Sequence, residues 1–269
     1  MHDHLINELR ARFDLQLSYP EGAKHSFLAA ELVKEENMRE FIDCYSPLMK
    51  ALDDTAAAAY FANWFSNVAL ALQYSISAFD TVPDLRLANL VIHLIPDGGY
   101  CRVMYSLQQW KTFDTAASGL ERGKWRYNTL ADFYQNTASP LIQCLSAVSG
   151  LNTGQIWGQL PTKFNYYLEN LTAEMNNSTT VKILQEDYIC LKNELSPEIF
   201  GLSKNPFRVN VLLIEDIADP KRTVQMRNRC CLFYRTEGRR YCYTCPRLKE
   251  VERAARRDDY REKAVIKSN

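Results

Sequence analysis

The chain has 269 residues, no formal net charge, a hydrophobic fraction of 46% and a charged fraction of 24%. This length allows one large domain or two small ones, and the composition is ordinary for a globular protein with a sizeable core. A neutral molecule has no overall field that would attract nucleic acid or an anionic membrane, so we expect no nucleic-acid partner.

No stretch reaches the ~18 to 20 uninterrupted apolar residues that a membrane helix needs. The first residues also lack the basic segment, apolar run and small-residue cleavage site of a signal peptide. We therefore expect a cytoplasmic protein, with at most peripheral contact to the inner membrane. In that reducing compartment, clustered cysteines more often bind metal than form disulfides.

The first half of the chain predicts helices followed by a β-hairpin. Residues 28–50 have the apolar pattern of a helix, and residues 53–78 that of one or two helices. Asp53 with Asp54 suits the positive N-terminal end of a helix. The run NLVIHLIPDGGYCRVMYSL then places two β-branched and aromatic segments around PDGG. Asp-Gly and Gly-Gly accept the positive φ of a tight turn, so this run predicts a hairpin.

The second half predicts more helix and a second hairpin. Residues 126–148 and the segment that begins at Pro161 have helical patterns, and two short helices are expected within 180–200. FRVNVLLIED and RTVQMRNR, separated by the turn IADPK, predict the second hairpin. The charged tail that follows forms either a solvated helix or a frayed end.

These elements indicate a helix-rich α+β fold with two β-hairpins, the second of which leads into a C-terminal cysteine segment. No repeat, low-complexity tract or Pro/Gly/Ser linker divides the chain, so we expect one continuous domain. Within it we distinguish an N-terminal helical and hairpin lobe over 1–120, a lobe over 121–249 that ends in the cysteine segment, and a charged tail over 250–269.

Four of the eight cysteines lie in the stretch CCLFYRTEGRRYCYTCPRL, residues 230–248. Cys242 and Cys245 have the spacing of a Cys-x2-Cys knuckle, in which a tight turn brings two thiolates to one ion in zinc and iron–sulfur sites. Cys230 and Cys231 are neighbours, and neighbouring side chains of an extended strand point to opposite faces. They can share one ion only if the backbone bends there; alternatively, each can reach a different iron of a two-iron cluster.

The spacing therefore favours an iron–sulfur cluster but leaves a structural zinc site open. A disulfide between neighbouring cysteines is disfavoured because its eight-membered ring is strained. The other four cysteines stand singly in apolar contexts and are expected to be buried core thiols. They are Cys44, Cys101, Cys144 and Cys190.

The same stretch is strongly basic. Between Lys221 and Lys249 the chain has nine Lys or Arg residues and a single acid, Glu237. Around an iron–sulfur cluster these cations would stabilise the reduced state and attract an anionic reaction partner. In the alternative, a zinc-stabilised binding module would use them to dock nucleic acid or an acidic protein. The residues predicted to dock a substrate are Arg235, Arg239, Arg240 and Trp157.

The cysteine pattern resembles the FhuF-like family of cytoplasmic siderophore-iron reductases. That family is marked by a C-C-x10-C-x2-C motif whose cysteines hold a two-iron two-sulfur (2Fe-2S) cluster. The motif is complete here and consists of Cys230, Cys231, Cys242 and Cys245. The resemblance therefore implies that these four cysteines bind a 2Fe-2S cluster, the one cofactor expected.

The resemblance extends upstream of the motif, over roughly residues 126–248. Asn205-Pro206 precedes the second hairpin and Ile156-Trp157-Gly158 precedes a helix, as in members of the family. Family members end soon after the last cysteine, whereas this chain continues past Leu248. The resemblance gives no role to that charged extension.

What the resemblance implies is a ferric-siderophore reductase, an oxidoreductase that acts on a metal ion. The hard oxygen ligands of a siderophore hold ferric iron better than ferrous iron, so one electron from the cluster would loosen the metal. This chemistry needs no nucleophile or general base, and the chain has no G-x-G-x-x-G or G-x4-G-K-[ST] nucleotide loop. The electrons would then come from an external donor.

Overall fold

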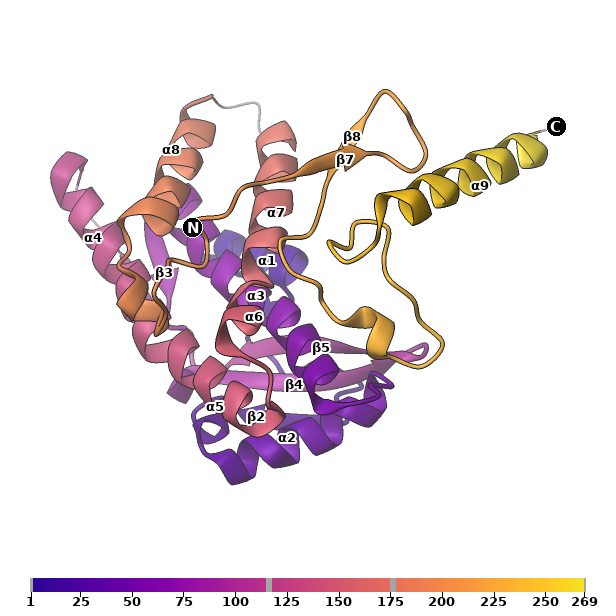
Figure 1. The fold of residues 1–269 in the computed structure, drawn as a ribbon. Helices are drawn as coiled ribbons and strands as arrows, with labels where there is room; N and C mark the ends of the chain where they lie inside the picture. Colours follow the sequence, from indigo (N-terminus) through magenta and orange to yellow (C-terminus); the bar gives the residue numbers. More distant parts are fainter. Residues whose placement is uncertain (1, 115–117, 175–177, 269) are drawn as a thin grey trace.

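The computed structural model describes residues 2–114, 118–174 and 178–268, and it has the expected helix-rich α+β fold (Figure 1). Its helices are α1 (His2–Phe13), α2 (Glu35–Leu48), α3 (Asp54–Phe79), α4 (Gly119–Asp132), α5 (Ser139–Ser149), α6 (Thr153–Trp157), α7 (Leu160–Glu174), α8 (Ser178–Ile189) and α9 (Glu250–Ser268). Its strands are β1 (Leu15–Gln16), β2 (His25–Leu28), β3 (Thr81–Pro83), β4 (Leu90–Asp97), β5 (Tyr100–Leu107), β6 (Thr112–Asp114), β7 (Leu213–Glu215) and β8 (Thr223–Gln225). Among the described residues, no helix combines the length and apolarity that crossing a membrane requires.

The helix α3 forms the centre of the fold. Nineteen of its 26 residues are buried, and helices α1, α2, α5, α6, α7 and α8 pack around it. Asp53 caps its N-terminus by accepting a hydrogen bond from the Ala56 backbone N–H at 3.0 Å. The N-terminal end of α3 is therefore fixed, and it is this end that the cysteine segment approaches.

The β4–β5 hairpin lies at the centre of a four-stranded sheet with the order β1-β5-β4-β2. Its antiparallel pairing ends with Asp97 opposite Tyr100, so the turn lies at Gly98 and Gly99. Their φ values are 53° and 103°, the positive region that the PDGG sequence predicts. The first predicted hairpin is therefore confirmed.

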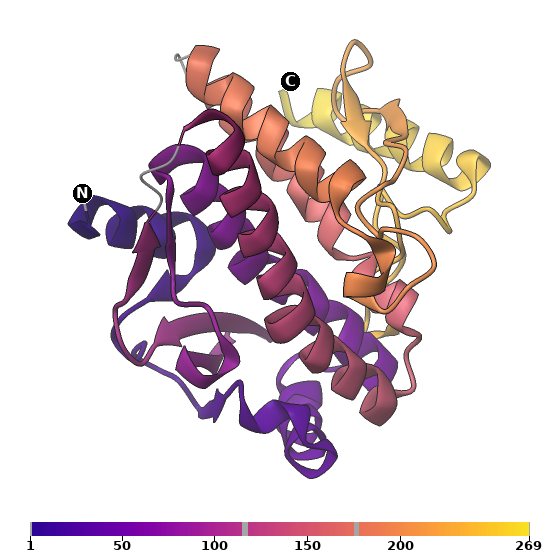
Figure 2. The same cartoon turned by 90° about the vertical axis from the view of Figure 1, so that its left-hand side faces the viewer.

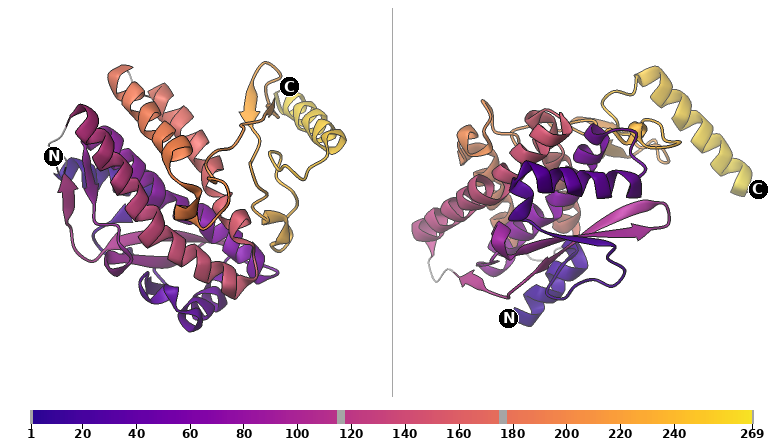
Figure 3. Two further views of the ribbon diagram at one scale, coloured as in Figure 1. Left: turned by 60° about the vertical axis from the view of Figure 1, so that its left-hand side comes forward. Right: turned by 90° about the horizontal axis from the view of Figure 1, so that it is seen from below.

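The second predicted hairpin is also present, but it is short. β7 and β8 pair over three residues each, with Ile214 opposite Val224, and loop flanks both strands. After α8 the chain passes along the edge of the helical body, forms this hairpin and returns as an extended segment (Figures 1 and 2). Helix α9 projects beyond that segment, away from the central helices (Figure 3).

Two helix boundaries differ from the prediction. The helix expected from residue 28 begins at Glu35, because residues 25–28 pair with β4 as strand β2. The helix expected from residue 126 begins at Gly119 and continues through a π-helical turn into α5. Residues 53–78, for which one or two helices are expected, form the single helix α3. The helix start around Pro161 is confirmed by α7.

Candidate metal centre

The cysteine segment, residues 226–249, packs against the N-terminal end of α3. Two alanines of this helix, Ala56 and Ala59, are fully buried and form one wall of a small apolar cluster. Their short side chains leave room for the segment to approach the helix closely. The opposite wall consists of Cys230, Leu232, Cys245 and Leu248.

Backbone hydrogen bonds and one ion pair attach the segment to the residues before α3. The Leu52 N–H donates to the Arg235 carbonyl at 2.9 Å, and the Glu237 N–H donates to the Lys50 carbonyl at 3.0 Å. Arg235 Nη2 also lies 2.7 Å from Asp53 Oδ2. The charge of Arg235 is therefore matched by the same carboxylate that caps α3.

The four thiols of the motif form two pairs. Cys245 Sγ lies 3.4 Å from Cys230 Sγ and donates to it, and the Cys231 thiol donates to the sulfur of Cys242. Two sulfurs bound at about 2.3 Å to one tetrahedral ion lie about 3.8 Å apart, so the Cys230–Cys245 spacing is near that of two ligands of one ion. Within the described ranges, no three His, Cys, Asp or Glu side chains gather around one metal position. The four thiols thus lie in two pairs.

The neighbouring cysteines belong to different pairs because of the local backbone. Cys230 and Cys231 reach different partners, as alternate positions of an extended strand do. The next residue, Leu232, has a φ of 57°, a left-handed conformation that reverses the chain direction. Gln155 and Gln159 hold the start of this bend, donating from Nε2 to the Cys230 carbonyl at 2.7 and 3.3 Å. The bend thus directs the two neighbouring thiols to different partners, Cys230 to Cys245 and Cys231 to Cys242.

Cys242 and Cys245 form the predicted tight turn. The Cys245 N–H donates to the Cys242 carbonyl at 3.1 Å, and the Arg247 N–H donates to Cys245 Sγ at 3.4 Å. Thr244 Oγ1 lies 3.8 Å from Cys242 Sγ. Donors around ligand sulfurs stabilise the extra negative charge of a reduced cluster and so raise its potential.

The electrostatics of the site favour negative charge on one of the thiols, that of Cys242. The hydrogen bond from Cys231 lowers the pKa of Cys242 to about 7, while that bond and burial raise the pKa of Cys231. The Arg227 guanidinium acts to lower both pKa values through its charge. Its Nη1 is buried and has no hydrogen-bond partner in the described parts of the chain. A half-buried cation close to Cys231 and Cys242 fits an anionic cluster.

Arginines of α9 bind the backbone of the cysteine turn. Arg253 is only 4% exposed and donates to three carbonyl oxygens at 2.9–3.2 Å, those of Tyr243, Cys245 and Leu248. Arg256 Nη1 donates to the Tyr241 carbonyl at 2.6 Å. Because these carbonyls flank Cys242 and Cys245, the charged tail is an ordered helix that holds the turn in place.

Arg239 and Arg240 are exposed and line an open cavity of about 660 Å³ in which Cys242 forms part of the wall. The Arg239 guanidinium lies 5.3 Å from the centre of the Phe233 ring. On the other side, α9 contributes Arg256 to the cavity lining. The cavity therefore joins exposed positive charge directly to one of the four thiols.

Trp157 does not lie at any docking surface. Its side chain is fully buried, its Nε1 donates to the Phe200 carbonyl at 3.1 Å, and its ring meets the Phe200 ring edge to face. The prediction that Trp157 docks a substrate is therefore wrong, because this aromatic residue anchors α6 in the core.

The four single cysteines lie in or against the core, far from each other in sequence. Cys101, Cys144 and Cys190 are buried, and Cys44 is half-buried and packs against the core. Burial raises the pKa of Cys101 to about 11 and that of Cys190 to about 12. These thiols stay protonated near neutral pH and are poor metal ligands.

Comparison with known families identifies the segment. The family model described as FhuF 2Fe-2S C-terminal domain matches residues 227–247. This segment is similar to the FhuF 2Fe-2S domain, and the match is consistent with an FhuF-like family. The cofactor of the FhuF domain is a 2Fe-2S cluster, which favours the iron–sulfur interpretation over the zinc alternative. A search of curated proteins finds no match to the chain.

Proposed function

We propose that the chain is a ferric-siderophore reductase whose 2Fe-2S cluster is held by Cys230, Cys231, Cys242 and Cys245. The observation that carries this proposal is the pairing of the four thiols within the FhuF domain. Cys230 and Cys245 would bind one iron, and Cys231 and Cys242 the other. When bound, the cluster supplies one electron to the ferric ion of a siderophore, whose hard oxygen ligands hold the ferrous product weakly.

The residues around the thiols would prepare the site for this transfer. Arg227 places a half-buried positive charge close to Cys231 and Cys242, which stabilises negative charge there. Arg253 fixes the turn between Cys242 and Cys245 by donating to the Cys245 carbonyl. The apolar wall of Ala56 and its neighbours excludes water from the inner side of the segment.

The substrate would dock at the outer side, where Cys242 lines the open cavity. We assign docking to Arg239 and Arg240, which are exposed and close to this thiol in the chain. Arg235 lies in the same segment, but its ion pair with Asp53 leaves less charge for a ligand. An anionic ferric chelate would be attracted to this face and would reach the cluster at its edge.

The two lobes distinguished in the sequence share one core in this proposal. Helix α3 from the 1–120 lobe packs against α5, α7 and α8 from the 121–249 lobe. The 250–269 tail closes the cysteine turn through α9. We therefore propose one continuous domain that works in the cytoplasm, where the ferrous iron is released, and receives electrons from an external donor.

A single-turnover experiment tests the reaction. Protein reduced anaerobically and freed of excess dithionite is mixed with a ferric siderophore in the presence of a chromogenic ferrous chelator. We expect the visible absorbance of the oxidised cluster to return as one ferrous ion appears per cluster. A reduced cluster that persists beside the ferric chelate, with no ferrous iron formed, would contradict the reductase proposal.

Reversing the charge of the docking pair should change substrate preference. The double variant Arg239→Glu, Arg240→Glu is expected to lower the rate constant for anionic ferric chelates by about tenfold at low salt, because electrostatic attraction governs encounter. Neutral chelates should be much less affected. Lys221→Glu with Arg222→Glu, on the turn of the β7–β8 hairpin, changes net charge equally and serves as control. Equal losses in both variants would remove the docking role from Arg239 and Arg240.

A further inference from the structure

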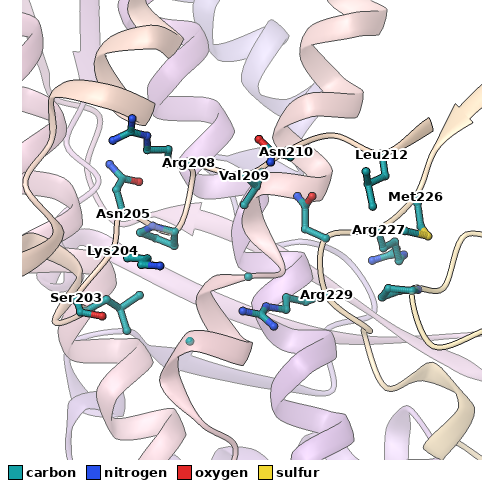
Figure 4. A pocket seen from close by; sticks show the side chains of 16 residues that line it. Ser203, Lys204, Asn205, Arg208, Val209, Asn210, Leu212, Met226, Arg227 and Arg229 are labelled. Atoms are coloured by element: carbon teal, nitrogen blue, oxygen red, sulfur yellow. The ribbon is translucent and has the colours of Figure 1, made fainter.

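A second cavity, of about 520 Å³, borders the cysteine segment (Figure 4). It shares no lining residue with the cavity of Arg239 and Arg240. Its lining comes from the loop over 202–212, from residues 226–229 and from Pro246. Figure 4 shows Lys204 and Asn205 on one side and Arg227 on the other, with Arg229 between them.

The cavity carries positive charge that the protein does not neutralise. Its basic residues are Lys204, Arg208, Arg227 and Arg229, and its lining includes no Asp or Glu. In the described part of the chain, none of these four side chains forms an ion pair. Neighbouring arginines behave differently, since Arg235, Arg253 and Arg261 all pair with carboxylates. A concave, uncompensated basic site attracts an anionic ligand.

The position of Arg229 depends on the missing side chain of Gly158. A Cβ at Gly158 would overlap Arg229 Cγ, although the φ of Gly158, −65°, suits any residue. Next to it, the Asn228 N–H donates to Thr162 Oγ1 at 3.0 Å. Asn228 Nδ2 and Arg227 Nη1 are buried without hydrogen-bond partners among the described residues. The base of the cavity is thus a fixed set of polar groups, part of which still lacks a partner.

The remaining wall is apolar and adjoins the thiols. Its apolar residues include Leu202, Pro206, Val209, Leu212 and Met226. Pro246, which follows Cys245 directly, completes the wall on the side of the motif. Arg227 belongs both to this lining and to the surroundings of Cys231 and Cys242. A ligand with an anionic group and a flat apolar part would match this combination, at a place next to the cluster ligands.

We propose that this cavity binds the electron donor, and that the donor is a small molecule with a phosphate group and an apolar redox ring, as in reduced flavin mononucleotide. The inference rests on the proposed function. An iron–sulfur cluster takes one electron at a time, which a reduced flavin can supply and a nicotinamide, a hydride donor, does not. The phosphate would bind Lys204 and Arg229, whose side chains extend toward one another in Figure 4, and the ring would lie on the apolar wall. Separate cavities would let donor and ferric chelate bind together.

The electrons of this cycle balance with two ferric ions for each flavin. The reduced flavin anion gives one electron through the cluster to the first ferric ion and is left as a neutral radical. The radical then gives a second electron to a second ferric ion and releases one proton to solvent. The products are two ferrous ions and oxidised flavin, and the protein is unchanged.

Reduced flavin mononucleotide and reduced riboflavin provide a matched test, because the two have the same ring and differ in the phosphate. Anaerobic stopped-flow would follow bleaching of the cluster by each. We expect saturation by the phosphate-bearing flavin at about tenfold lower concentration, as one or two charged hydrogen bonds would give. The double variant Lys204→Gln, Arg229→Gln should abolish this difference. The control Lys221→Gln, Arg222→Gln, which removes the same charge outside both cavities, should preserve it.

A second pair of variants tests the cavity without changing its charge. Gly158→Ala should displace Arg229 and weaken the phosphate preference, whereas Gly123→Ala, which has open space around it, should not. Equal saturation by both flavins in the unmodified protein would overturn the inference, as would a preference that survives loss of Lys204 and Arg229. Dithionite reduction and oxidation by ferric chelate are recorded on the same samples. Failure of those two steps would count against the reductase itself, not against the donor site.

Discussion

Cys242→Ser and Cys245→Ser are each expected to remove the cluster or to change its spectrum, whereas Cys144→Ser should leave it intact. The first two thiols belong to the paired motif, and Cys144 is a buried thiol of α5. Serine is a poorer ligand for iron than a thiolate, so a ligand position should lose the metal. Iron, acid-labile sulfide and the visible spectrum of anaerobically purified protein measure the outcome.

The pairing of the four thiols also predicts how variants that retain a cluster should differ from one another. Cys230→Ser and Cys245→Ser alter ligands of one iron, and Cys231→Ser and Cys242→Ser alter ligands of the other. Electron paramagnetic resonance of the reduced variants should therefore fall into these two groups. Grouping by sequence neighbours, with Cys230 resembling Cys231, would contradict the observed pairing, and equal loss from Cys144→Ser would contradict the division into ligands and core thiols.

Arg253→Met is expected to lower the free energy of unfolding by about 3 kcal/mol and to speed the loss of iron to a chelator. Arg253 donates to three carbonyl oxygens around the cysteine turn, and hydrogen bonds from a charged group contribute about 1.5–3 kcal/mol each, with partial compensation by water. Lysine has no planar fork and cannot reach all three oxygens, so Arg253→Lys should have an intermediate effect. Denaturant unfolding and the rate of iron transfer provide the measurement.

Lys263→Met is the matched control on the same helix. Its side chain is 68% exposed and pairs with Asp259 one turn away, so the change should stay within about 0.5 kcal/mol. If Arg253→Met retained both stability and cluster as well as this control, α9 would not be part of the site.

The cysteine pattern and the first hairpin could be predicted because their information is local. A Cys-x2-Cys turn and a PDGG turn are set by a few neighbouring residues, as the Cys245 N–H bond to Cys242 and the positive φ of Gly98 show. The start of α2 could not be predicted from local sequence, because residues 25–28 form a strand only by pairing with β4, far along the chain.

The site residues that the sequence missed depend on tertiary contacts. In the sequence, Arg227 is only one of the nine basic residues between Lys221 and Lys249. Nothing local shows that its Nη1 is buried and that its charge acts on Cys242. Arg253 and Arg256 stand at helical spacing on one face of the tail, a signal for a docked helix that high overall charge concealed. The prediction for Trp157 failed because an aromatic residue before a helix can face either the core or a ligand, and the local sequence does not distinguish the two. Its side chain faces the core.

Metal and sulfide analysis of one anaerobic preparation tests the central claim most directly. A four-cysteine 2Fe-2S centre requires two irons and two acid-labile sulfides per chain, no stoichiometric zinc, and a red-brown colour that bleaches with dithionite. A colourless protein that holds one zinc per chain and no sulfide would contradict the iron–sulfur centre and the reductase built on it.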